Sequence, residues 1–106
     1  MNKIKGVSAN PGKVIGKVNI LLEISEIEKM QQGDILVTKT TNPMFTLAIL
    51  KAKAIVTDHG GPLCHTAIVA REMNVPCVVG TTNATKILKQ GQEITVDGTI
   101  GEIFYE

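Results

Sequence analysis

The sequence predicts a single α/β domain, with strands at both ends of the chain and alternating strands and helices between them. Its 106 residues suffice for one hydrophobic core but not for two substrate-binding lobes around a cleft. Hydrophobic residues make up 43% and charged residues 20% of the chain, which is typical of a folded globular protein. No repeat, low-complexity tract or linker-like stretch interrupts residues 1–106, so we expect one compact domain.

Two strands around a loop are expected at the start of the chain. Residues 3–8 interleave charged or small residues with Ile4 and Val7, and residues 16–22 place Val18, Ile20 and Leu22 on one face. Asn10-Pro11-Gly12 between them is typical of a turn. Apolar residues at three-residue spacing over residues 24–30 indicate a short helical turn. The run Ile35-Leu36-Val37-Thr38 then predicts a buried strand.

The middle of the chain twice repeats a helix followed by a strand. Proline suits the first turn of a helix over residues 43–51, and residues 54–57 follow as a strand. A second helix is expected over residues 65–73, ended by Asn74 in a left-handed position. Residues 77–79 then resume the sheet, because Pro76 prevents the helix from continuing.

The last third predicts a short helix and a hairpin. Residues 82–88 are expected to form the helix, and Gly91 separates it from the hairpin. Residues 94–96 are expected to pair with residues 101–105 across an Asp97-Gly98 turn.

Composition argues against nucleic acid and membrane partners. The net charge is +1, and the only aromatic residues are Phe45, Phe104 and Tyr105, so a basic patch with stacking aromatics is missing. The first residues contain no apolar signal core, and no run reaches membrane-spanning length. We therefore expect a cytoplasmic protein.

The cysteines and histidines do not form a metal-binding pattern. Cys64 and Cys77 are expected to be free thiols, because nothing in the sequence indicates secretion. Together with His59 and His65 they could be imagined as zinc ligands, but no pair has CxxC or HxxxH spacing. We expect no metal site.

His65 follows a glycine pair at the predicted start of the second helix. Gly60 and Gly61 let the backbone turn tightly and approach a ligand, while the first N–H groups and the dipole of a helix favour negative charge. A phosphoryl group on the imidazole fits this setting. The alternative from the short motif alone is an ordinary strand-to-helix loop with a locally satisfied histidine.

A phosphate-accepting histidine must attack as the neutral imidazole, which a positive helix terminus favours. One ring nitrogen must also be held so that the other points outward. A hydroxyl such as that of Thr46, Thr57 or Thr66 could do this, and the sequence does not select among them.

Nearly the whole chain resembles the mobile phosphohistidine domain of the phosphoenolpyruvate-utilising enzymes. This family includes pyruvate phosphate dikinase, phosphoenolpyruvate synthase, enzyme I of the sugar phosphotransferase system and rifampicin phosphotransferase. The segments that match in order and spacing are residues 33–37, Thr41, Pro43, residues 54–58, Gly60-Gly61, residues 64–72 and residues 75–81. Leu63 departs from the commoner threonine, and Asn74 from a frequent glycine.

The resemblance implies a swivelling β/β/α domain in which His65 accepts a phosphoryl group and passes it on. The partners implied are a nucleotide-binding domain or subunit and one that binds phosphoenolpyruvate, pyruvate or another acceptor. The residues expected to support the phosphate are Gly60, Gly61, Cys64, Thr66, Thr46 and Arg71.

These supporting roles have alternatives. Thr46 lies three residues after Pro43, a spacing that resembles the threonine contacting the active histidine in enzyme I, but its hydroxyl could bond to its own helical turn. Arg71 could balance phosphate charge or form a solvated ion pair on the helix. Cys64 is expected to pack as a small residue beside the site rather than to act as a nucleophile, and this argues against a hydrolase that uses Cys64 with His65.

The chain lacks nucleotide-binding motifs. It contains no GxxxxGK[ST] loop, no dinucleotide-type glycine turn and no carboxylate cluster for magnesium, so ATP and Mg are expected on a partner domain. The chain is therefore expected to be a phosphotransferase component, either separately encoded or excised from a larger enzyme, and not a complete enzyme. The alternative is a non-catalytic regulatory module of the same fold that docks to a partner enzyme.

Overall fold

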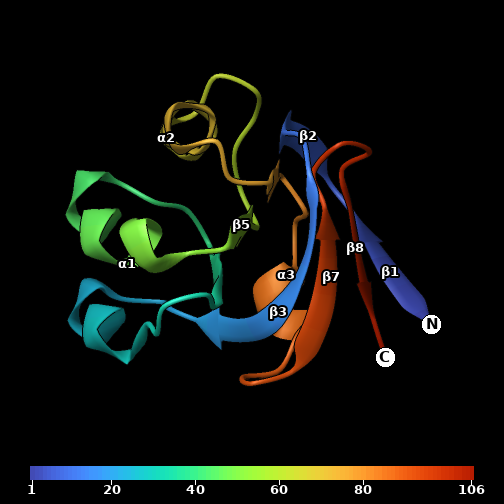
Figure 1. Cartoon of the computed structure of the whole chain (residues 1–106), viewed down its shortest axis with the longest axis horizontal. Coiled ribbons are helices and arrows are strands. Elements are labelled where there is room, and N and C mark those ends of the chain that lie inside the picture. Colours follow the sequence, from blue (N-terminus) through green and yellow to red (C-terminus); the bar gives the residue numbers. More distant parts are fainter.

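An eight-stranded sheet that folds over at its longest strand organises the molecule (Figure 1). The computed structural model describes all of residues 1–106. The strand order is β1-β8-β7-β3-β4-β5-β6-β2. The strands are β1 (Asn2–Lys5), β2 (Val7–Asn10), β3 (Lys13–Ile20), β4 (Ile35–Thr38), β5 (Ala54–Thr57), β6 (Cys77–Val79), β7 (Glu93–Asp97) and β8 (Glu102–Tyr105).

Strand β3 belongs to both halves of the sheet. Its residues 13–17 pair antiparallel with β7, and its residues 18–20 pair in parallel with β4. One half therefore contains β1, β8 and β7, and the other contains β4, β5, β6 and β2. A core of 12 buried residues, among them Ile4, Val37, Val78 and Ile103, draws side chains from both halves, so the two halves pack face to face.

Helices cover the other face of the β4-β5-β6 half. They are α2 (His65–Met73), α1 (Thr46–Lys51) and two 3₁₀ helices, η1 (Ile24–Lys29) and η2 (Pro43–Phe45). Along β4, Ile35 and Val37 enter the core between the sheet halves, whereas Leu36 enters a second core of 13 residues beneath the helices. The layers are thus β, β and α, which confirms the predicted fold class. The remaining helix, α3 (Ala84–Ile87), contributes Ala84 to the core between the sheet halves.

The alternation predicted for the middle of the chain is confirmed. Strands β4, β5 and β6 are parallel neighbours, as helical crossovers require. Helix α2 has the predicted bounds, and Asn74 ends it with φ of 55°. The C-terminal hairpin also forms, with Val96 opposite Ile103.

The predictions for the start of the chain need correction. The strand expected over residues 3–8 is two strands divided at Gly6, because β1 pairs with β8 whereas β2 pairs with β6 at the other end of the strand order. A Cβ on Gly6 would lie 2.6 Å from the carbonyl oxygen of Val79, so the chain crosses between strands where no side chain fits. The strand expected over residues 16–22 runs from Lys13 to Ile20 and does not pair with either.

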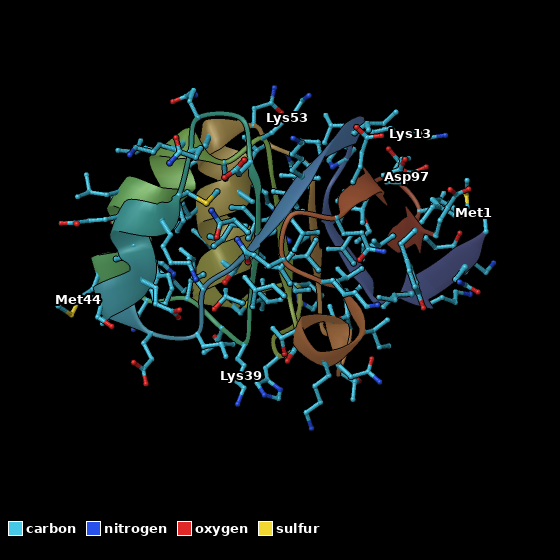
Figure 2. All side chains as sticks on the ribbon, turned by 90° about the horizontal axis from the view of Figure 1, so that it is seen from below. Met1, Lys13, Lys39, Met44, Lys53 and Asp97 are labelled. Atoms are coloured by element: carbon cyan, nitrogen blue, oxygen red, sulfur yellow. The ribbon has the colours of Figure 1, made fainter.

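The carboxyl ends of β4 and β5 lie on one edge of the molecule. Figure 2 shows Lys39, just after β4, at one edge and Lys53, just before β5, at the opposite edge. The loops that follow β4 and β5 therefore meet, and these loops contain Thr41 and the glycine pair. This is the edge where ligands usually bind in parallel α/β sheets.

The two ends of the chain lie side by side, away from α2 (Figure 1). Asn2 in β1 pairs with Tyr105 in β8. None of the helices has the length and apolar character that crossing a bilayer would require.

Candidate functional site

His65 is the first residue of α2 and follows directly from the loop after β5. Its N-cap neighbour Cys64 is extended, with φ of −72° and ψ of 165°, and makes no side-chain capping hydrogen bond. No capping side chain therefore occupies the N–H groups of the first turn, which remain able to bind an anion beside the imidazole. His65 itself is half-buried.

Only one residue of the glycine pair has to be glycine for the loop to adopt its conformation. Gly60 has φ of +122°, and a Cβ there would lie 2.8 Å from Cys64 Sγ. Gly61 has no atom within 4 Å of such a position and no left-handed backbone. The protein itself therefore requires glycine at position 60, whereas position 61 is open.

Polar contacts fix the beginning of the same loop. The buried carboxylate of Asp58 accepts hydrogen bonds from the backbone N–H and the hydroxyl of Thr85, at 2.9 and 2.6 Å. The His59 N–H donates to the carbonyl of Lys39 at 2.9 Å, which joins the loops after β5 and β4. The loop before His65 is thus hydrogen-bonded both to α3 and to the loop after β4.

Thr41 is the residue whose hydroxyl holds His65. Thr41 Oγ1 lies 2.9 Å from His65 Nδ1 and 2.6 Å from Thr66 Oγ1. Thr41 and Thr66 are buried, at 6% and 1% exposed. With Nδ1 engaged, Nε2 is the ring nitrogen without a protein partner.

Among the three hydroxyls considered from the sequence, the structure brings only Thr66 into this network. Thr46 Oγ1 donates to the Pro43 carbonyl at 2.5 Å, so the expected support of His65 by Thr46 is corrected: its hydroxyl bonds to its own turn. Thr57 Oγ1 donates to the carbonyl of His59 at 2.7 Å. The hydroxyl with the contact to His65 comes from Thr41 instead.

Position in the sheet could have identified Thr41. It follows the predicted buried strand 35–38, as the glycine pair follows the strand 54–57, and parallel strands bring their carboxyl ends together. The threonine spacing taken from Pro43 pointed downstream, whereas the contact comes from two residues upstream.

Arg71 reaches back toward the same loop. Its Nη2 donates to the carbonyl of Pro62 at 2.6 Å, and it forms no ion pair on the helix. The guanidinium therefore stabilises the segment just before His65.

The two cysteines differ in environment. Cys64 is half-buried and packs against the core beneath the helices, as expected for a small apolar neighbour of the site. Cys77 is fully buried on β6, and burial, with a smaller effect of Cys64, raises its pKa to about 12. Cys77 is therefore an inert thiol.

The surface around His65 is open and partly apolar. His65 lines none of the three pockets of the chain, of which the largest, about 350 Å³, lies between Leu22 and Phe45. Large apolar side chains are exposed next to it in sequence, with Leu63 84% and Ile68 47% exposed, and on the neighbouring helical segment, with Met44 65% and Leu47 66% exposed. No three His, Cys, Asp or Glu side chains gather as a metal site.

A β/β/α domain that presents a helix-start histidine on an open surface has the features of a mobile domain that works against partner surfaces. Residues 30–101 match the family model described as PEP-utilising enzyme, mobile domain. The chain belongs to this family.

Its relatives include phosphoenolpyruvate synthases. The chain is 52% identical over 101 residues to the phosphoenolpyruvate synthase of Pyrococcus furiosus, covering 95% of this chain and 12% of that protein. It is 50% identical over 101 residues to a probable phosphoenolpyruvate synthase of Methanothermobacter thermautotrophicus, covering 95% and 15%. The chain thus spans a small part of the relatives that it matches.

Solved structures agree with the fold. A solution structure of enzyme I shares 29% identity with a TM-score of 0.65, over 76% of this chain and 33% of that chain. Aconitase X of Thermococcus kodakaraensis, at 19% identity, has a TM-score of 0.76 over 100% of this chain and 99% of that chain, which shows the fold alone.

Proposed function

We propose that this chain is a phosphoryl carrier in which His65 Nε2 accepts a phosphoryl group from one partner and delivers it to another. The observation that supports this most is the contact between Thr41 Oγ1 and His65 Nδ1 at 2.9 Å. It holds the ring at Nδ1 and leaves Nε2 without a protein partner, so Nε2 is the nitrogen that a phosphoryl donor can reach.

In the loading step, the lone pair of neutral Nε2 attacks phosphorus. The N–P bond forms as the bond from phosphorus to the oxygen of the leaving group breaks, and the leaving group keeps that electron pair. The imidazole hydrogen lies on Nδ1 during attack, where it donates a hydrogen bond to Thr41 Oγ1, and it passes to solvent as the neutral phosphohistidine forms. Delivery to the acceptor reverses these bond changes.

The start of α2 supports the loaded state. The backbone N–H groups after Cys64 and the positive end of the nine-residue helix favour the negative phosphoryl oxygens. Arg71 adds a cation whose guanidinium lies at the carbonyl of Pro62, three residues before His65, and we include it among the groups that balance the phosphate charge.

The donor and the acceptor are proposed to be sites on partner domains or subunits. ATP with Mg, and phosphoenolpyruvate or pyruvate, would bind there, because His65 lies outside every pocket of this chain. Leu63 and Ile68, within three residues of His65, together with Met44 and Leu47 expose apolar side chains that such partners can contact while excluding water.

Intact-mass analysis and phosphorus NMR test this proposal after incubation with extract of the native cells and either ATP or phosphoenolpyruvate. We expect one acid-labile, base-stable phosphate on the wild type and none on His65→Ala. His59→Ala is the matched control, since His59 is the only other histidine and is exposed. Unchanged labelling of His65→Ala would refute the carrier role. No labelling from either donor, in an extract shown to contain the binding partner, would favour the regulatory module.

A further inference from the structure

Thr66 stands at the end of the hydrogen-bonded chain that begins at His65. His65 Nδ1 contacts Thr41 Oγ1 at 2.9 Å, and Thr41 Oγ1 contacts Thr66 Oγ1 at 2.6 Å. Thr66 Oγ1 makes no other hydrogen bond, and its residue is 1% exposed. Phosphoryl transfer at Nε2 gives Thr66 no direct chemical task.

The number of hydroxyl hydrogens fixes which group donates in each hydrogen bond between Thr66, Thr41 and His65. Each hydroxyl has one hydrogen, and a buried hydroxyl that fails to donate loses the energy of that bond. The Thr66 hydroxyl has only Thr41 Oγ1 as a hydrogen-bond partner, so its hydrogen points to that oxygen. The hydrogen of Thr41 is then directed to His65 Nδ1, which must be the acceptor.

This direction favours one chemical form of the imidazole. A ring with phosphate on Nε2 has a free lone pair on Nδ1, which matches a donating Thr41. The free ring that is ready to attack has its hydrogen on Nδ1, and it forces Thr41 to accept. Thr41 must then direct its own hydrogen at Thr66, whose hydroxyl loses its partner.

We propose that Thr66 is a positioning residue that acts through Thr41 to hold Nδ1 of His65 as a hydrogen-bond acceptor. In the free protein, Thr66 favours the tautomer with hydrogen on Nε2. In the loaded protein it stabilises phosphohistidine against the form that is ready to attack. The second statement rests on the proposed carrier function, whereas the first does not.

The first test is nitrogen-15 NMR of the histidine-labelled chain at about pH 8.5, where an ordinary imidazole is neutral. Wild type and Thr66→Ser, which keeps the hydroxyl, are expected to hold the hydrogen on Nε2. Thr66→Val, which keeps the shape without the hydroxyl, should shift the tautomer ratio toward Nδ1–H by about two- to ten-fold, as loss of one hydrogen bond implies.

Two results would overturn the inference. One is an equal tautomer ratio in Thr66→Val and the wild type. The other is a wild-type ring with its hydrogen mainly on Nδ1, which requires no variant and so decides the matter even if Thr66→Val fails to fold.

The second test measures how fast His65 takes up phosphate from a donor and returns it to the spent donor. The free ring with hydrogen on Nε2 and the phosphorylated ring both keep the Thr66 hydrogen bond, whereas the ring that is ready to attack loses it. Thr66→Val should therefore speed both directions by about two- to ten-fold, and Thr66→Ser should match the wild type. Equal rates in all three would overturn the stabilising role. If His65 takes up no phosphate at all, the carrier function fails, and the tautomer measurement still decides the direction of the hydrogen bonds.

Discussion

Asp58 and Thr85, 27 residues apart in the chain, are joined by two hydrogen bonds from one residue to one carboxylate. Asp58 directly follows β5 and opens the loop to His65, and Thr85 lies in α3. Asp58 is only 4% exposed, and no cation pairs with its carboxylate. The N–H and hydroxyl of Thr85 are therefore what make its burial tolerable.

Replacing this carboxylate should destabilise the fold. We expect Asp58→Ala to lower the free energy of unfolding by about 1.5–3 kcal/mol, because two charge-assisted hydrogen bonds are lost and Thr85 is left unpaired. Urea denaturation followed by circular dichroism measures this. Glu72→Ala, an exposed carboxylate on α2, should stay within about 0.5 kcal/mol of the wild type. Equal effects of the two changes would contradict the anchoring role.

Substitutions of Thr41 and Thr46 should have different effects on the rate at which His65 takes up phosphate. Thr41→Val removes the oxygen that holds the ring in place and accepts the Nδ1 hydrogen of the attacking imidazole, so the rate of phosphoryl uptake should fall about ten-fold. Thr46→Val should leave that rate unchanged, since the Thr46 hydroxyl bonds to Pro43. Rapid-quench measurement of phosphohistidine compares them. A slow Thr46 variant with a normal Thr41 variant would reverse the assignment.

The two glycines of the loop should respond differently to a methyl group. Gly60→Ala is expected to cost about 1–3 kcal/mol of stability, because its backbone is left-handed and the new Cβ would overlap Cys64 Sγ. Gly61→Ala should be neutral or slightly stabilising, since nothing lies near its Cβ position. Thermal and chemical denaturation of both variants tests this, and a destabilised Gly61→Ala would show that the loop geometry differs.

Cys77 should not react with thiol reagents until the protein unfolds. Iodoacetamide at about pH 8 should modify half-buried Cys64 in the native protein and both cysteines in denaturant, as peptide mass mapping will show. Native labelling of Cys77 would contradict its burial.

The raised pKa of Cys77 also gives stability a pH dependence. Its folded value is about 12 against an ordinary 9.0, so between these values the unfolded thiol loses its proton while the folded thiol keeps it. Stability from this group is complete below about pH 9 and declines as pH rises toward 12, by up to about 1.4 kcal/mol per pH unit. Cys77→Ala should show a shallower decline, and identical slopes would contradict the shift.

Local patterns were enough to predict the centre of the fold. The run 35–38, the helix from His65 to Met73 and the left-handed Asn74 depend on hydrophobic spacing and capping, which neighbouring residues determine. The division at Gly6 was not predictable in this way. It depends on Val79, which lies against Gly6 only after the sheet has formed.

Prediction of the candidate site from the sequence has the same limit. The position of His65 at a helix start followed from Gly60, Gly61 and the apolar pattern of the helix. The hydroxyl that contacts it did not, because Thr41 lies 24 residues away and several threonines were available. Only the parallel order of β4 and β5 brings Thr41 beside His65.

Asn2 and Tyr105 are paired neighbours on the side of the domain away from α2, so residues 2–105 begin and end at nearly the same point (Figure 1). Such a unit can be spliced into an exposed loop of an unrelated protein without forcing the loop ends of the host apart. Inserted in this way, the domain would add a helix-start histidine to the surface of the host, while the inserted domain and the host each keep their own hydrophobic core.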